Sequence, residues 1–272
     1  MATAILIVYT KEGFFIAADG LKRTSDGKVV GTSAQKLFPI EGPTPSFAAY
    51  ALAASVQLSP PGEDEEIVSD FIKEMEAATA DAGSAPPNLQ AYMEGIATRI
   101  RGSLRRTMDA CPALKLPPTP GKGKPVNERL DTIAFVLFAG YFSGSPDFGY
   151  IRFVHEDQKL MEPQVTTCSL DIGKPNGYLS EAIAPALFYS EDPLFKRYRI
   201  FKRSPEDRTL ADGLKMMASY FRACADSKIR VLDEDHCASV GGTIRAANIT
   251  PRDGFKWIDR RRVNRAFQTL SL

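Results

Sequence analysis

The sequence lacks the usual signs of a secreted, disulfide-stabilised or membrane-spanning protein. Its four cysteines are widely scattered and form no Cys-x-x-Cys pair, so their spacing supports neither a disulfide framework nor a zinc site. The N-terminus has no basic region ahead of its first short apolar run, and we expect no signal peptide. The longest apolar runs, at 47–56 and 133–142, are well short of the roughly 18 residues that suggest a membrane span. Reduced thiols in a cytoplasm are therefore the expectation.

An excess of charge of one sign is also absent. The 272 residues contain 34 Lys and Arg against 33 Asp and Glu, which leaves a formal net charge of +1. This balance argues against a protein built around a polyanion, so we expect no nucleic-acid partner and no membrane partner. Apolar residues make up 44% of the chain, and a chain this long can bury a core without a disulfide or metal. No repeat of about 20 to 50 residues is present to indicate a solenoid.

Local basic clusters and one His-Cys pair are only weak signals of nucleic-acid or metal binding. The basic clusters are Arg99, Arg101, Arg105 and Arg106 in one stretch and Arg260–Arg262 in another. A solvated helix end explains the first cluster better than nucleic-acid binding does. The second cluster lies beside Trp257 without any RNA-binding motif, and its meaning stays open. His236 and Cys237 are adjacent, but no second pair stands at zinc spacing, so we expect no metal and no cofactor.

The chain begins with strand signals and continues with alternating helices and hairpins. Apolar runs at 4–9 and 14–18, with a turn between them, predict a hairpin. Further strands are predicted at 28–30, 36–40, 131–141, 150–155, 243–249 and 255–258, and helices at 67–75, 89–104, 178–188 and from Ser204 onward. Continuous apolar character in the first strands indicates that both faces of their sheet are covered.

This order predicts two stacked sheets with helices outside each. Strands, two helices, a hairpin, two helices and final strands are typical of a four-layer αββα sandwich in the α+β class. The second set of strands has no obvious core of its own, so we expect a single domain over 1–272. The segment 111–129 carries five prolines and is interpreted as a proline-rich loop or insertion.

Thr3 stands at the edge of the first predicted strand. A threonine at a mature N-terminus carries its own general base, because the free α-amine can take the hydroxyl proton. That amine has a typical pKa of ~7.7–8.0, and the mechanism needs no histidine in a chain that has two. A lysine can lower the effective pKa of the hydroxyl and an aspartate can orient the lysine, which makes Lys36 and Asp19 candidates. By spacing alone, a strand threonine, a solvated lysine and a turn aspartate explain these residues better than catalysis does.

Several stretches together resemble proteasome β-type subunits. They are Thr3–Tyr9, Lys11–Asp19, Gln35-Lys36-Leu-Phe-Pro-Ile40, Phe138-Ala-Gly-Tyr141, Phe148–Arg152, Val240-Gly-Gly-Thr-Ile-Arg-Ala-Ala-Asn-Ile249 and Asp253–Trp257. The stretches occur in the family's order and at compatible separations, from Thr3 to Trp257. The resemblance implies the fold of the N-terminal nucleophile (Ntn) hydrolases, which has the αββα layering.

The resemblance also implies a catalytic site. Thr3 falls at the position of the family's nucleophile, and Asp19 and Lys36 match the family's aspartate and lysine. In the family, backbone N–H groups stabilise the oxyanion; the matching segment includes Ala49 and Tyr50 and lacks the family's glycine.

Two supporting motifs of the family are only partly present. The family's aspartate and serine ahead of Gly-Gly fall near Asp235 and Ser239 when one residue is inserted. Its Gly-Ser-Gly motif is matched only by the degraded stretch Asp171–Gly177. These matches imply, without further support, that Asp235 and Ser239 assist the catalytic residues.

The first two residues leave two functions open. Removal of Met1 alone leaves Thr3 with an amide in place of a free amine, whereas cleavage after Ala2 exposes the amine. The first reading is a threonine-type peptidase or amidohydrolase acting on a peptide or protein substrate. The second is a non-catalytic structural or assembly subunit of the same fold. The resemblance further implies a homo-oligomer, as a ring or partial ring, and an unfoldase as a candidate partner.

Overall fold

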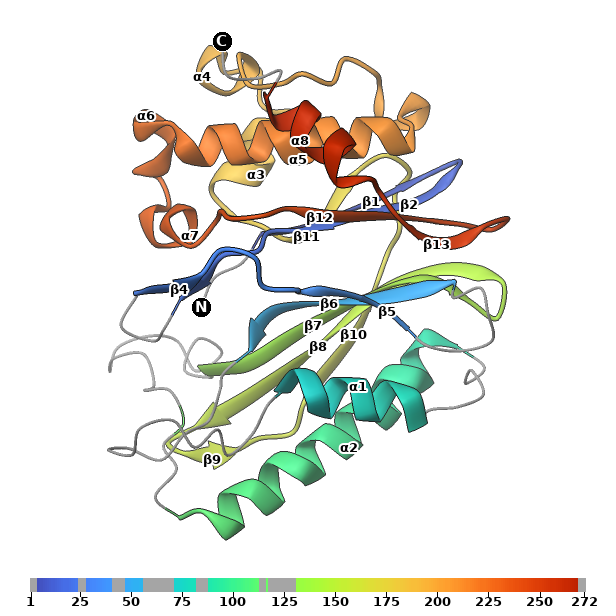
Figure 1. The fold of residues 1–272 in the computed structure, drawn as a ribbon, viewed down its shortest axis with the longest axis vertical. Helices are drawn as coiled ribbons and strands as arrows, with labels where there is room; N and C mark the ends of the chain where they lie inside the picture. Colours follow the sequence, from blue (N-terminus) through green and yellow to red (C-terminus); the bar gives the residue numbers. More distant parts are fainter. Residues whose placement is uncertain are drawn as a thin grey trace.

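The computed structural model describes residues 4–23, 28–40, 47–55, 71–81, 88–112, 116 and 131–268. Two β-sheets lie face to face, with helices on their outer faces (Figure 1). The first sheet contains, in spatial order, β11 (Pro175–Tyr178), β1 (Ile5–Thr10), β2 (Gly13–Ala18), β12 (Arg245–Thr250) and β13 (Gly254–Trp257). The second contains β10 (Gln164–Cys168), β8 (Ser145–Glu156), β7 (Asp131–Phe142), β6 (Ala48–Ser55) and β5 (Leu37–Pro39), with β9 (Lys159–Leu160) paired to β8. A short pair, β3 (Lys22–Arg23) and β4 (Val29–Gly31), stands apart.

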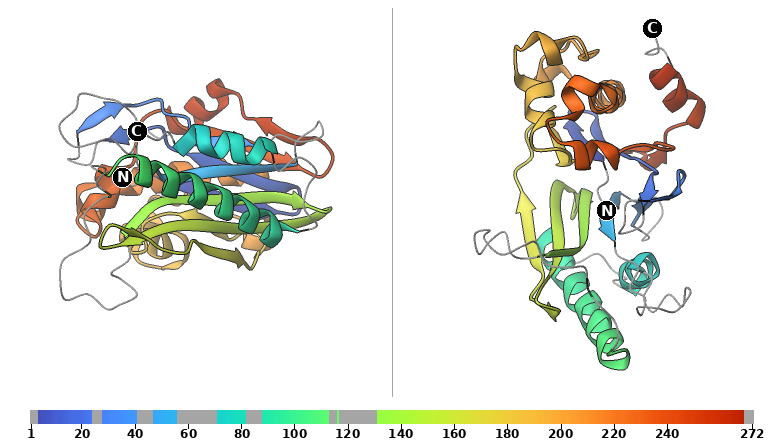
Figure 2. Two further views of the ribbon diagram at one scale, coloured as in Figure 1. Left: turned by 90° about the horizontal axis from the view of Figure 1, so that it is seen from below. Right: turned by 90° about the vertical axis from the view of Figure 1, so that its left-hand side faces the viewer.

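The helices divide between the two outer faces. On the second sheet lie α1 (Phe71–Asp81) and α2 (Leu89–Ala110), which the view from below shows in front of the strands (Figure 2). On the side of the first sheet are α3 (Ile183–Tyr189), α4 (Pro193–Lys196), α5 (Leu210–Ala225), α6 (Ser227–Arg230), α7 (Glu234–Ala238) and α8 (Arg260–Gln268). The expectation of a mixed fold of sheets and helices is confirmed.

Buried apolar side chains form three clusters that join these elements. One cluster lies between the sheets and includes Ile5, Ile16 and Leu137. A second joins α1 and α2 to the second sheet, and a third joins α3 and α5 to the first sheet. The β-strands of the first hairpin are buried on both faces because helices cover one side and the other sheet covers the other.

Helix α2 confirms the periodicity of its sequence. Asn88 caps it, since its side chain accepts a hydrogen bond from the Ala91 N–H at 2.8 Å, which satisfies one of the free donors of the first turn. The predicted apolar stripe is the buried face: Leu89, Tyr92, Met93, Ile96, Ile100 and Leu104 are all buried.

Two helix starts differ from the sequence prediction. The helix expected from Ser204 begins at Leu210, and a short 3-10 helix, Pro205–Asp207, precedes it. Thr209 and Asp212 form a capping box at the true start, so the helix begins there and not at the Ser204-Pro205 signal. The helix expected over 178–188 begins at Ile183, because Tyr178 ends β11 and pairs with Ile5 of β1.

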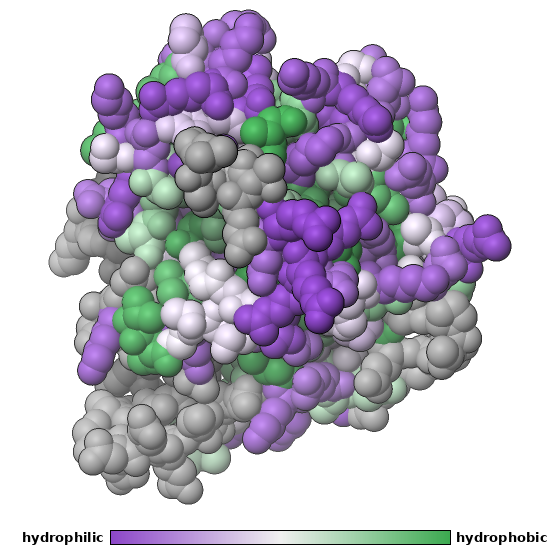
Figure 3. All heavy atoms as spheres, turned by 45° about the horizontal axis from the view of Figure 1, so that its top comes forward, coloured by the Kyte–Doolittle hydropathy of each residue, from purple (hydrophilic) through white to green (hydrophobic). Residues whose placement is uncertain are grey.

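Other elements were not predicted. The apolar run 47–56 contains the interior strand β6, and the tail after Trp257 contains α8. Arg260–Arg262, at the start of this last helix, are exposed. The face of the molecule seen in Figure 3 is rich in hydrophilic side chains. Of the proline-rich segment 111–129, only 111, 112 and 116 belong to the described residues, and the start of the predicted first helix, 67–70, lies outside them. Among the described helices, none combines the length and apolar character needed to cross a membrane.

Candidate functional site

The carboxylate of Asp19 is the centre of a buried hydrogen-bond network at one end of the first sheet. Asp19 follows β2 directly and is 1% exposed. Its Oδ1 accepts the Ala4 N–H at 3.1 Å, and its Oδ2 accepts the N–H groups of Gly241 at 3.0 Å and Leu21 at 3.3 Å. Three backbone donors from three segments therefore converge on one side chain.

Lys36 completes this network with a charge. Its Nζ lies 2.9 Å from Asp19 Oδ1 and donates a second hydrogen bond to the Leu21 carbonyl at 2.7 Å. Lys36 immediately precedes β5, and its own carbonyl accepts the Leu52 N–H of β6. The side chains of Lys36 and Asp19 are 11% and 0% exposed, so the pair is held in a low-dielectric environment.

Burial shifts both pKa values of the pair. It lowers the pKa of Lys36, because the ammonium loses hydration, and Asp19 partly opposes this shift. It raises the pKa of Asp19, and the Lys36 charge together with the Gly241 and Ala4 amides works against the rise. An ionised carboxylate that accepts three backbone N–H groups and one charged side-chain donor is the state that this geometry supports.

The register of the first hairpin brings Ala4 to Asp19. Ile5 pairs with Ala18, which puts Ala4 opposite Asp19, and the Asp19 N–H donates to the Ala4 carbonyl at 3.1 Å. Thr3 lies outside the described residues. The nitrogen of the Thr3–Ala4 peptide bond is nevertheless the atom that donates to Asp19 Oδ1, so the predicted nucleophile is attached directly to this network.

The Gly-Gly pair allows the loop after α7 to approach Asp19. Gly241 donates to the carboxylate, and the Gly20 N–H donates back to the Gly241 carbonyl at 3.1 Å. Gly242 has a φ of +74°, and a Cβ there would stand 2.4 Å from the Thr32 carbonyl oxygen. Only glycine fits this conformation and this space without displacing the backbone.

A second polar pair at the same end of the molecule was not predicted. The Ser180 hydroxyl donates to Asp233 Oδ2 at 2.6 Å, and the Ser180 N–H donates to the Tyr220 hydroxyl at 2.7 Å. Ser180 is 2% exposed and follows β11, whose Tyr178 pairs with Ile5. No motif in the sequence marks Ser180, and the degraded Gly-Ser-Gly match pointed to earlier residues.

His236 packs against two tyrosines beside the Ser180–Asp233 pair. Its ring centroid is 6.2 Å from those of Tyr178 and Tyr220, and its backbone N–H donates to Asp233. Burial lowers the pKa of His236, although Asp233 and Asp19 oppose the shift. The imidazole is therefore neutral near pH 7. Within the described part of the chain, no group of three or more His, Cys, Asp or Glu side chains is arranged to hold a metal ion.

The other expected site residues make hydrogen bonds and strand pairs of their own. Asp235 is exposed, and the Ser239 hydroxyl donates to the Asp235 carbonyl instead of to the site. Ala49 and Tyr50 lie inside β6, between β5 and β7, and pair with residues of both neighbours. Their amides belong to strand ladders, whereas the β6 amide that reaches the Lys36 backbone is that of Leu52.

Comparisons with known proteins agree with this architecture. No protein-family model matches the chain, and no curated protein matches it. Two solved structures of Anbu, a bacterial proteasome-like protein, are similar to it. A (Gly-1) mutant of Anbu from Hyphomicrobium sp. strain MC1 matches with a TM-score of 0.53 and 13% identity, over 99% of this chain and 93% of that chain. The helical assembly of the Anbu complex from Pseudomonas aeruginosa matches with a TM-score of 0.52 and 12% identity, over 98% and 92%. The chain therefore has a mixed α/β fold similar to that of Anbu.

Proposed function

We propose that the chain is a threonine-type peptidase or amidohydrolase of the proteasome β-like class, with Thr3 as the nucleophile after cleavage behind Ala2. The observation that carries the proposal is the buried Lys36–Asp19 pair, whose carboxylate also holds the Ala4 amide. A charged pair costs free energy to bury. Asp19 bonds the N–H of the Thr3–Ala4 peptide bond, so a catalytic role at Thr3 would explain why the pair is buried despite this cost.

In this mechanism each residue has a distinct role. The Thr3 α-amine takes the proton of the Thr3 hydroxyl, which attacks the substrate carbonyl. The Lys36 ammonium favours the developing alkoxide, and Asp19 fixes the positions of Lys36 and of the backbone at Ala4. The amine then protonates the leaving group, and water hydrolyses the acyl-enzyme.

The proposal extends to architecture and assembly. We assign the two sheets and their outer helices to the four-layer αββα sandwich of the Ntn hydrolases, as one domain over 1–272. The supporting polar pair in this site is Ser180–Asp233, in place of Asp235 and Ser239. Self-association into a ring or partial ring in the cytoplasm, with an unfoldase as a candidate partner, follows from the same assignment.

The non-catalytic subunit is the competing proposal, and one observation favours it. Met1 and Ala2 precede Thr3, and an unprocessed chain has no free amine to act as base. A non-catalytic subunit keeps Ala2, forms no adduct with a β-lactone and hydrolyses no peptide.

Matched substitutions at position 3 test the catalytic proposal. Purified full-length protein is assayed for peptide hydrolysis beside its Thr3→Ser and Thr3→Ala variants. Catalysis by Thr3 predicts partial activity for serine, which keeps the hydroxyl, and none for alanine. Equal activity of the alanine variant would refute the role of Thr3.

A further inference from the structure

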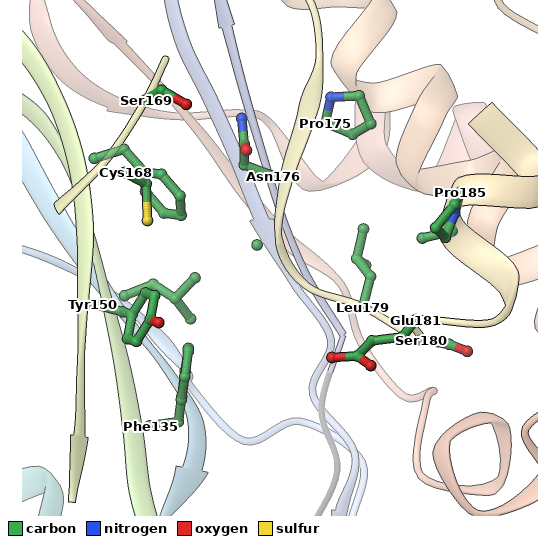
Figure 4. Close-up of a pocket in the computed structure, with 14 residues that line it drawn as sticks. Phe135, Tyr150, Cys168, Ser169, Pro175, Asn176, Leu179, Ser180, Glu181 and Pro185 are labelled. Carbon is green, nitrogen blue, oxygen red and sulfur yellow. The ribbon is translucent and has the colours of Figure 1, made fainter. Parts of the chain in front are cut away.

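An open groove lies between the free edges of the two sheets. The edge strands β11 and β10 end their sheets on the same side of the molecule and are joined by residues 169–174. A cavity of about 390 Å³ lies between β11 and the facing strands of the second sheet (Figure 4). Among the described residues, no strand pairs with the outer edge of β11.

The groove has apolar walls and a polar end. The rings of Phe135 and Tyr150 stack at 4.8 Å on the wall formed by the second sheet. Leu179 lies on the opposite wall, and Glu181 lies at the end nearest to Ser180 (Figure 4). Ala184 also lines the cavity. A concave, mainly apolar surface of this size with a few polar groups is typical of a ligand site.

The backbone of β11 presents hydrogen-bonding groups at its free edge, beside this groove. In β1, Ala4 and alternate residues after it bond to β2, as the Asp19–Ala4 bond shows. The intervening residues Ile5 and Ile7 therefore bond to Tyr178 and Asn176. Gly177 lies between these two, so its N–H and C=O point away from β1 at the free edge of the sheet, and Gly177 itself lines the cavity. Glycine is required there, because its φ is +127° and a Cβ at this position would stand 2.1 Å from the Ile5 carbonyl oxygen.

The groove is continuous with the candidate site. Ser180 lines its end and donates to Asp233 from there. Tyr178, two residues earlier, pairs with Ile5 beside the Ala4–Asp19 hydrogen bonds. A chain lying in the groove thus has one end next to the residues assigned to catalysis.

We propose that this groove binds an extended segment of the peptide substrate, which adds to the free edge of β11 at Gly177. Main-chain hydrogen bonds to Gly177 and Leu179 hold the segment, as in other cases of strand addition. An apolar side chain lies over Phe135 and Tyr150, and a basic residue approaches Glu181. That the bound peptide is a substrate rests on the proposed function, whereas peptide binding in the groove does not depend on catalysis.

Two features favour a peptide over a compact small molecule. The unpaired strand edge suits a partner with regularly spaced donors and acceptors. The cavity accommodates one or two side chains, and its single charge, Glu181, selects for a basic residue at one end.

The test measures binding in the catalytically blocked full-length Thr3→Ala protein. The probe is the peptide fluorescein-Lys-Val-Phe-Val-Thr-amide, which carries its label on the N-terminal amine so that the Lys side chain stays charged, and binding is followed by fluorescence anisotropy. Ala184→Phe, which fills the groove, is expected to weaken binding by about tenfold or more. The matched control is Ala182→Phe, an exposed neighbour that does not line the groove, and it is expected to change affinity by less than about twofold. Circular dichroism confirms that both variants are folded.

Hydrogen exchange locates the bound peptide. Added peptide is expected to slow exchange at the Gly177 and Leu179 amides, and Glu181→Gln is expected to reduce the preference for Lys over Gln at the first position of the probe. Equal affinities in the two phenylalanine variants, or protection confined to other strands, would overturn the proposal. A change of oligomeric state in Ala184→Phe without peptide binding would also overturn it, in favour of a second copy. Peptide binding without hydrolysis by the wild type would contradict only the proposed function.

Discussion

Lys36 Nζ lies 2.9 Å from Asp19 Oδ1, and neither side chain is more than 11% exposed. The two residues come from different sheets: Asp19 follows β2 and Lys36 precedes β5. The ion pair therefore joins the sheets at the end where the chain begins. Each charge of this buried pair is stabilised by the other, because bulk water cannot solvate either one if its partner is removed.

Removing one member of this pair should destabilise the fold strongly. Lys36→Met leaves the Asp19 carboxylate buried without its cation, which costs about 3–5 kcal/mol of unfolding free energy. The double variant Lys36→Met/Asp19→Asn should recover part of this loss. Urea unfolding measures both values. The control is Lys256→Met, whose partner Asp253 is also exposed; an exposed pair is worth roughly 0–1 kcal/mol. Equal losses in the two single variants would contradict the account.

The Ser180–Asp233 hydrogen bond should matter more than a similar bond at the surface. Ser180→Ala removes a donor from a partly buried carboxylate, and we expect a loss of about 1–3 kcal/mol of unfolding free energy. Ser204 donates to Asp207 at 2.9 Å in an exposed setting, so Ser204→Ala is the matched control and should cost much less. Chemical denaturation at pH 7 compares the two. A larger loss for Ser204→Ala would show that the buried pair has no special role.

The steric cost of a side chain at position 242, close to Thr32, should be separable from the cost of its positive φ. Gly242→Ala places a Cβ 2.4 Å from a carbonyl oxygen at a φ of +74°, whereas Gly144 has a φ of +84° with nothing within 4 Å of its Cβ position. Gly144→Ala should therefore cost about 1 kcal/mol from conformation alone. Gly242→Ala should cost roughly 2 kcal/mol more, because the loop that donates to Asp19 must move. Thermal unfolding of both variants tests the difference, and equal melting temperatures would contradict it.

His236 should make the protein less stable in mild acid. Burial lowers the pKa of His236 below its ordinary value of 6.5, so the unfolded chain binds this proton more readily than the folded chain. Stability from this residue is present above the unfolded pKa and is lost as pH falls through it toward the folded pKa. Asp19, whose pKa is raised by burial, affects the pH dependence of stability in the opposite direction. The difference between wild type and His236→Gln isolates the histidine. Unfolding free energies from pH 7.5 to pH 5 should fall less in the variant, and parallel curves would exclude the effect.

Local periodicity predicted much of the fold because several segments carry a complete local signal. The first hairpin has two apolar runs and a turn, and α2 has a cap and one continuous buried stripe. β6 was not predicted because it is an interior strand of small residues, and its pairing with β5 and β7 depends on distant segments. The start of α5 was misplaced because the Ser204-Pro205 signal forms only a 3-10 helix, while Thr209 provides the cap.

The site could be predicted only in part, because some of its contacts join segments that are distant in the sequence. Asp19 and Lys36 were found through the resemblance, and the structure joins them directly. Ser180 and Asp233 are 53 residues apart in sequence, and nothing local indicates that they meet. Their pairing depends on β11 beside β1 and on the turn that leads into α7.

The mass of the intact purified protein, measured together with its peptide hydrolysis, tests the central claim most directly. The account predicts an active chain that begins at Thr3, with Met1 and Ala2 both absent and with a β-lactone adduct on Thr3. Fully active protein that retains Ala2 would contradict it, because the α-amine of Thr3 would then be unavailable as the base.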